Sequence, residues 1–78
     1  MTKQNETAFY QSYIQKRKGI ESPHAPDAMV KHTLSRMADE FTAIYPDDEE
    51  EIREYLRIEE DRIIGANHAA RPLYGYND

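Results

Sequence analysis

The chain has 78 residues, a net charge of -5 and no cysteine. A chain this short forms at most one domain and buries only about 60–65% of the surface of its unfolded state, so its stability is marginal without further support. The composition excludes disulfides and thiolate metal sites, and its acidity argues against a nucleic-acid binder held by phosphate contacts.

The first predicted element is a short helix over residues 5–18, after four polar residues that we expect to fray. Its apolar side chains recur at helical spacing: Phe9, Tyr10, Tyr13 and Ile14. Gly19 follows as a stop signal. The helix ends in the basic cluster Lys16-Arg17-Lys18, which complements the helix dipole. Helix termination explains this cluster most simply, and anion binding is the alternative.

A connector over residues 20–26 contains two prolines, which make it stiff. The second predicted helix covers residues 26–45, because apolar residues follow the i, i+4, i+7 rule. These residues are Val30, Leu34, Met37, Ala38, Phe41, Ile44 and Tyr45. Pro46 ends this helix.

The third predicted helix covers residues 47–71, with Asp47 and Glu50 in the spacing of a capping box. Its apolar stripe consists of Ile52, Tyr55, Leu56, Ile63, Ala66 and Ala70. The very short connection at Pro46 predicts that the second and third helices are antiparallel neighbours. The fold class is therefore all-α, a single domain over residues 1–78. It consists of an antiparallel αα-hairpin with a short N-terminal helix and a tail at 72–78. We expect this tail to pack either within its own subunit or against a neighbouring subunit.

Three residues of the third helix break its pattern. Ile58 and Ile64 lie off the stripe, and Glu59 lies on it. Covering an isoleucine is worth roughly 1.5–3 kcal/mol, a large share of the stability of a small domain. We therefore expect a homo-oligomer, from dimer to hexamer, unless the N-terminal helix and tail cover this surface. Glu59 either pairs with Arg62, Lys31 or another subunit, or reaches solvent at the rim.

No arrangement in the sequence is typical of an enzyme. The three histidines are far apart and lack the i, i+4 spacing of a helical metal site. A Gly-rich phosphate loop and a nucleophile motif are both missing, and the acidic run 47–51 is explained by capping and solvation. We expect no catalytic residues, no metal and no cofactor. No apolar run suits a signal peptide or a membrane span, so we expect a cytoplasmic protein without membrane contact.

Binding of a small ligand is better supported. Arginines on the third helix and tyrosines towards both ends of the chain provide guanidinium forks and flat rings. Arginine binds phosphate bidentately and tyrosine stacks on bases, which suits a phosphate-bearing purine ligand. The same residue types are also common at protein interfaces.

Several segments together resemble a known family. The first is Lys31-His32-Thr33-Leu34-Ser35-Arg36, with His32 where the family has an aromatic residue, followed by Ile44-Tyr45-Pro46-Asp47. The third is Tyr55-Leu56-Arg57-Ile58-Glu59-Glu60, and the last is Ala66-Asn67-His68-Ala69-Ala70-Arg71. Over residues 26–71 the chain resembles the anti-CBASS cyclic-nucleotide sponges of phages, whose helical hairpin is shared with anti-Thoeris sponges.

The resemblance implies a compact oligomer, often hexameric, in the host bacterial cytoplasm. It would bind cyclic di- or trinucleotides between subunits without cleaving them. Family members carry a Pro-Lys-Pro segment before the hairpin, whereas this chain has Ser22-Pro23-His24-Ala25-Pro26 without the lysine. The predicted ligand-binding residues, from the resemblance and from composition, are Tyr10, Tyr13, Lys18, Lys31, Arg62, Asn67 and Arg71. We expect Arg62→Ala and Arg71→Ala to abolish binding and leave the helices intact.

A second hypothesis is a small acidic inhibitor that blocks a host or phage-defence enzyme by surface contact through residues 47–51. A DNA mimic would need more acidic surface than a net charge of -5 provides.

Overall fold

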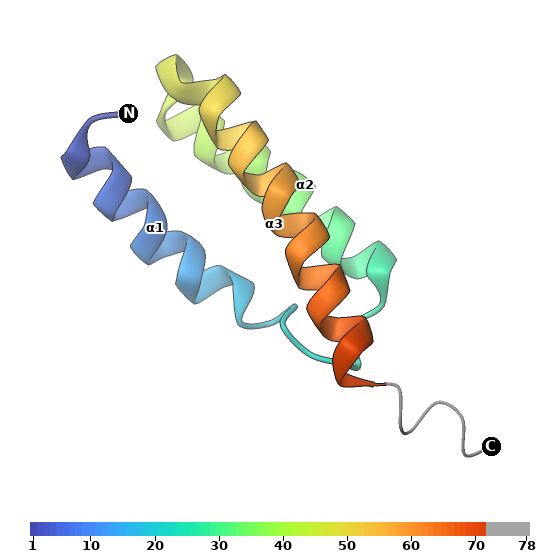
Figure 1. Ribbon diagram of the computed structural model, residues 1–78. Helices are drawn as coiled ribbons and strands as arrows, with labels where there is room; N and C mark the ends of the chain where they lie inside the picture. Colours follow the sequence, from blue (N-terminus) through green and yellow to red (C-terminus); the bar gives the residue numbers. More distant parts are fainter. Residues whose placement is uncertain (72–78) are drawn as a thin grey trace.

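The computed structural model describes residues 1–71, and this part of the chain is helical without a strand. The elements are α1 (Lys3–Arg17), α2 (Asp27–Ile44), the 3-10 turn η1 (Pro46–Asp48) and α3 (Glu49–Ala70). In Figure 1, α2 and α3 lie side by side and run in opposite directions, and α1 lies beside them, running in the same direction as α3. The prediction of an all-α chain is confirmed. The predicted tail at 72–78 lies outside the described residues.

Helix α1 begins two residues earlier than predicted, because Thr2 caps it. The Thr2 hydroxyl accepts a hydrogen bond from the Asn5 backbone N–H at 3.1 Å. The expectation that residues 1–4 fray is wrong. The Met1 ammonium group lies 3.2 Å from a carboxylate oxygen of Asp48 and 3.1 Å from one of Glu51, which ties the start of α1 to the start of α3.

Helix α2 follows the prediction closely. It begins after Pro26 and ends just before Pro46, and five of its predicted apolar residues are buried: Val30, Leu34, Met37, Ala38 and Phe41. Of the other two predicted residues, Ile44 has 62% of its surface exposed and Tyr45 is partly buried. The helix ends there, and Tyr45 turns the chain into η1.

The predicted capping box of α3 is wrong. Residues 46–48 form a 3-10 turn, so the N-cap is Asp48, and its side chain makes no capping hydrogen bond. The Asp48 carboxylate lies beside the Met1 ammonium group instead. The predicted stripe holds for Ile52, Leu56 and Ile63, which are buried.

Near its C-terminal end, α3 buries Asn67 rather than the predicted Ala66 and Ala70, which are exposed. The Asn67 side-chain amide donates a hydrogen bond of 2.9 Å to the backbone carbonyl of Ile20. Here α3 faces the connector, so the buried side of the helix differs from the one that periodicity predicted.

Aromatic rings hold α1 against the other helices. Phe9 is 2% exposed, and its ring centroid lies 4.7 Å from that of Phe41 and 5.7 Å from that of Tyr55. The Tyr10 and Tyr13 rings also meet Tyr55, at 5.2 and 5.6 Å. The buried face of α1 is therefore a cluster of aromatic edges and faces.

The two isoleucines that lie off the stripe have different surroundings. Ile64 is partly buried and packs against the core of the same chain. Ile58 remains 51% exposed. The monomer itself therefore partly buries Ile64, and of the two only Ile58 still favours an oligomer.

Candidate functional site

The seven residues predicted to bind a ligand do not meet in one place within the chain. Tyr13 and Arg62 meet at the Glu59 carboxylate, whereas Asn67 and Arg71 lie at the connector. Tyr10 packs on Tyr55. The remaining two, Lys18 and Lys31, are exposed.

Glu59 is the centre of a buried polar network and is 7% exposed. Its carboxylate accepts a hydrogen bond of 2.7 Å from the Tyr13 hydroxyl and two of 2.8 Å from the Arg62 guanidinium. Arg17 adds a longer bond of 3.4 Å and stacks on the Tyr13 ring. The expected pairing of Glu59 with Arg62 is confirmed, and the rim alternative is wrong. Arg62 therefore has a structural role in addition to any role in binding.

The network shifts the pKa values of Glu59, Tyr13 and Arg62. The hydrogen bonds from Arg62 are the largest effect and lower the pKa of the Glu59 carboxyl, against the opposing effect of burial. Burial, helped by the bond to Glu59, raises the pKa of the Tyr13 hydroxyl. The Glu59 carboxylate raises the pKa of Arg62. At neutral pH the network thus contains the ionised carboxylate of Glu59, the guanidinium group of Arg62 and the neutral phenol of Tyr13.

This lowered pKa predicts an acid dependence of stability. The contribution of Glu59 is complete above the ordinary glutamate pKa of about 4.3 and is lost as the pH falls through the lower native value. We expect Glu59→Gln to be less stable than the wild type at pH 7, and this difference to shrink towards pH 3. Thermal unfolding by circular dichroism between pH 3 and pH 7 measures it. A constant difference over that range would contradict the assignment.

A second polar cluster joins the ends of α2 and α3. His68 Nε2 lies 2.9 Å from both carboxylate oxygens of Asp27. The Arg71 guanidinium donates to the carbonyl of Ala25 at 3.3 Å and reaches Asp27 at 3.5 Å. The bond from His68 is the largest effect on Asp27 and lowers the pKa of its carboxyl. Arg71 and Asn67 thus both bind the connector.

Five of the six arginines bond a carboxylate: Arg17, Arg53, Arg57, Arg62 and Arg71. Arg36 is the exception within residues 1–71. The carboxylates nearest to it on α2 lie beside other cations, since Asp39 is 3.3 Å from Arg53 and Glu40 is 3.8 Å from Lys16. In a chain with 15 acidic and 10 basic residues, a guanidinium without a carboxylate partner is a candidate for binding an external anion.

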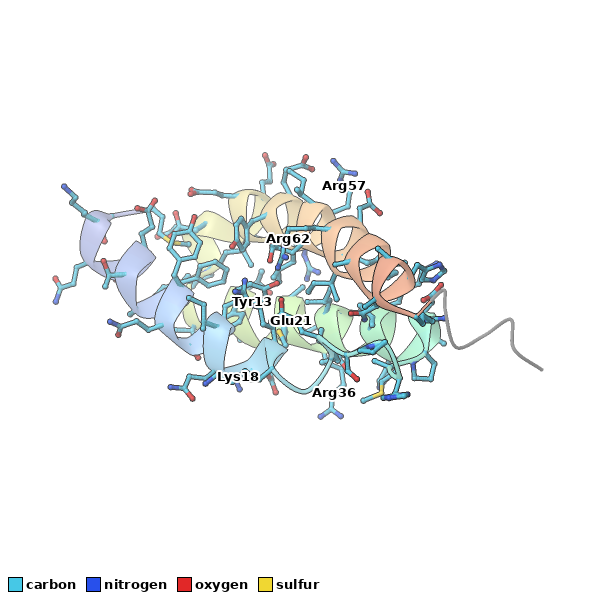
Figure 2. The ribbon with its side chains drawn as sticks, turned by 60° about the horizontal axis from the view of Figure 1, so that its bottom comes forward. Tyr13, Lys18, Glu21, Arg36, Arg57 and Arg62 are labelled. Carbon is cyan, nitrogen blue, oxygen red and sulfur yellow. The ribbon has the colours of Figure 1, made fainter. Side chains whose placement is uncertain are left out.

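Arg36 lines a hollow of about 240 Å³ between α1 and α2. The other lining residues are Lys16, His32, Thr33, Met37 and Glu40. Figure 2 shows Arg36 and Lys18 on the side of the molecule opposite Arg57. Most of these side chains carry hydrogen-bond donors, and the one apolar side chain among them, that of Met37, is buried. We call this the α1–α2 hollow.

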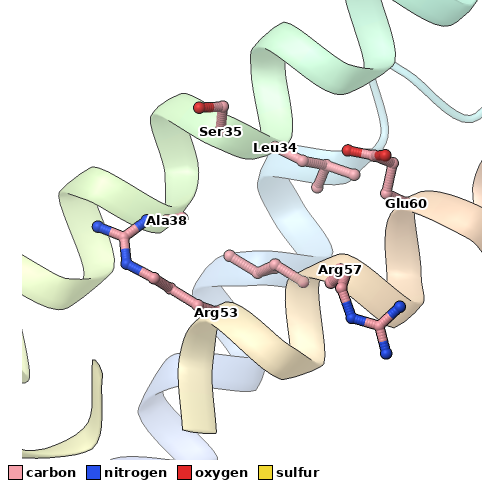
Figure 3. Close-up of a pocket in the computed structure, with 7 residues that line it drawn as sticks. Leu34, Ser35, Ala38, Arg53, Arg57 and Glu60 are labelled. Carbon is pink, nitrogen blue, oxygen red and sulfur yellow. The ribbon is translucent and has the colours of Figure 1, made fainter. Parts of the chain in front are cut away.

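Two other hollows are less suited to an anion. The one in Figure 3, of about 170 Å³, lies between α2 and α3 and contains Arg53 and Arg57. Arg57 forms a two-bond pair with Glu54, and Arg53 bonds Glu49 and Asp39. The other, of about 490 Å³, is lined by residues 46–51, five of which are acidic. Of these three hollows, the α1–α2 hollow is the one lined by an arginine that has no carboxylate partner among residues 1–71.

In the sequence, Arg36 and His32 stand out only as members of the family pattern, and Lys16 stands out only as part of a helix terminus. Their i, i+4 spacing on α2 was the available signal. Lys16 comes from another helix, so periodicity could not join it to them.

Comparison of the chain with family models, with curated proteins and with solved structures gives no match. In residues 1–71 no three histidine or acidic side chains form a possible metal-binding group. No helix in the same range is long and apolar enough to cross a membrane.

Proposed function

We propose that the chain binds a cyclic oligonucleotide second messenger, with a phosphate in the α1–α2 hollow, and sequesters it without cleaving it. The observation that carries this proposal is Arg36, which lines a hollow and has no carboxylate partner in the described residues. The resemblance to phage sponges of immune signals supports the ligand class and the absence of cleavage. Such a protein would act in the host bacterial cytoplasm.

The donors around Arg36 are those that a phosphate needs. A guanidinium binds two phosphate oxygens in parallel, and the Lys16 ammonium group adds a second positive charge. His32 and the Thr33 hydroxyl supply further donors. Lys16 is held only by a 3.8 Å contact between exposed groups, so turning it towards a ligand costs little.

The size of the hollow favours a site completed by a second copy of the chain. About 240 Å³ is smaller than the roughly 300–1,000 Å³ of typical ligand pockets, and a cyclic dinucleotide is a large ligand. Ile44 and Ile58 are more than half exposed, and Met29 and Ile14 nearly so. Burial of such side chains between subunits would stabilise a homo-oligomer, in the range from dimer to hexamer.

The test compares Arg36→Ala with Arg57→Ala. Both residues are exposed helical arginines, but Arg57 lies away from the hollow and is bonded to Glu54. A hydrogen bond to a charged group is worth about 1.5–3 kcal/mol. We therefore expect Arg36→Ala to weaken binding by roughly tenfold or more, and Arg57→Ala to leave it within about twofold.

Native mass spectrometry with a panel of cyclic di- and trinucleotides and cyclic ADP-ribose isomers measures binding and subunit number together. A wild-type protein that binds no member of the panel would overturn the proposal. Equal loss of binding in both variants would move the site away from the α1–α2 hollow.

The alternative function is an acidic inhibitor that contacts an enzyme through residues 47–51. It is favoured by the hollow at that end, where neither Asp47 nor Glu50 has an ion-pair partner in the described range. It predicts a stable complex with a host protein that is lost in the double variant Asp47→Asn, Glu50→Gln. Nucleotide binding would then be absent in the same preparation.

A further inference from the structure

One carboxylate lies among the donors of the α1–α2 hollow. Glu40 lies one helical turn after Arg36 and is the only acidic residue within residues 1–71 that lines this hollow. Its nearest cation is Lys16, at 3.8 Å, with both side chains about half exposed. The Glu40 carboxylate is thus only loosely engaged by the rest of the described chain.

A carboxylate accepts hydrogen bonds and repels phosphate, so a ligand with a phosphate in this hollow binds more favourably when another of its groups donates to Glu40. Guanine and adenine differ in the hydrogen-bond donors that they can offer to a carboxylate. Guanine has two adjacent donors, N1–H and the N2 amino group, which match the two oxygens of a carboxylate. Adenine has one amino donor beside the N1 acceptor, and that acceptor would face the second oxygen of the carboxylate.

We propose that Glu40 makes the α1–α2 hollow selective for guanine-bearing cyclic nucleotides over adenine-bearing ones. This inference rests on the proposed function and specifies its ligand. Arg36 and Glu40 lie on the same face of α2, about 6 Å apart along the helix axis. Arg36 would bind a phosphate of the ligand, and Glu40 would bind its base.

The experiment is isothermal titration of the full chain with cyclic di-GMP and with cyclic di-AMP. We expect the wild type to bind the guanine ligand roughly tenfold to a hundredfold more tightly, the range of one bidentate base contact. Glu40→Gln should lose this preference, because the amide presents one acceptor and one donor. Its affinity for the adenine ligand should be unchanged or higher, since a charge that repels phosphate is removed.

Glu50→Gln is the matched control, because Glu50 is also an exposed glutamate on a helix but lies at the acidic end of α3. It should keep the wild-type preference. Equal affinity of the wild type for both ligands, or an unchanged preference in Glu40→Gln, would overturn the role of Glu40 and leave the proposed function standing. If the wild type binds neither ligand nor any other nucleotide of the panel, both proposals are overturned.

Discussion

Phe9→Ala is expected to lower the free energy of unfolding by about 3–5 kcal/mol, the usual cost of removing a buried phenylalanine ring. Phe9 is 2% exposed and touches the rings of Phe41 on α2 and Tyr55 on α3. A domain of this length has a total stability of roughly 4–12 kcal/mol, so the loss is a large part of it. Helix α1 would then no longer be held in place.

Urea unfolding followed by circular dichroism measures this effect. Gln11→Ala is the control, since Gln11 lies on the same helix and is exposed. It should cost less than about 1 kcal/mol. A similar loss in both variants would show that the aromatic cluster is not what holds α1. Because Lys16 is on α1, Phe9→Ala should also impair the α1–α2 hollow and weaken nucleotide binding.

Arg62→Ala is the second variant with a large expected effect. It removes both 2.8 Å bonds to Glu59 and leaves a buried carboxylate with Tyr13 and the longer contact to Arg17. Breaking a fully buried pair costs about 3–5 kcal/mol. Arg62 is 45% exposed and Arg17 remains, so solvent and the second cation reduce the expected cost to roughly 1–3 kcal/mol.

The control is Arg57→Ala, which breaks a pair of exposed groups on the same helix. We expect a change of at most about 1 kcal/mol. The thermal midpoint of Arg62→Ala should therefore fall by roughly 4–8 °C for each kcal/mol lost, and that of Arg57→Ala should fall only slightly. Equal midpoints for the two variants would contradict a structural role of the Glu59 network. A loss of ligand binding in Arg62→Ala indicates a lost ligand contact only if the thermal midpoint shows that the variant is still folded.

Much of the helical structure was predictable from local chemistry. The apolar spacing of α2 and the prolines on either side of it set its limits to within one residue, because proline and side-chain burial act over a few positions. The start of α3 was not predictable in the same way. Asp48 is the N-cap there, and its carboxylate lies beside an ammonium group 47 positions away in the chain.

In the candidate site, too, some features follow from the sequence and others follow from tertiary contacts. The sequence by itself determined that the chain is acidic, lacks cysteine and forms helices with apolar faces, since these properties depend on composition and short-range periodicity. Only the tertiary structure decided which cations remain available for a ligand. Asp39 and Glu40 are both at helical spacing from Arg36, yet Arg53 of α3 binds the first and Lys16 of α1 lies beside the second. Ion pairing between helices depends on which side chains meet in space, and that is why Arg36, rather than Arg62 or Arg71, is the arginine without a carboxylate partner in the described chain.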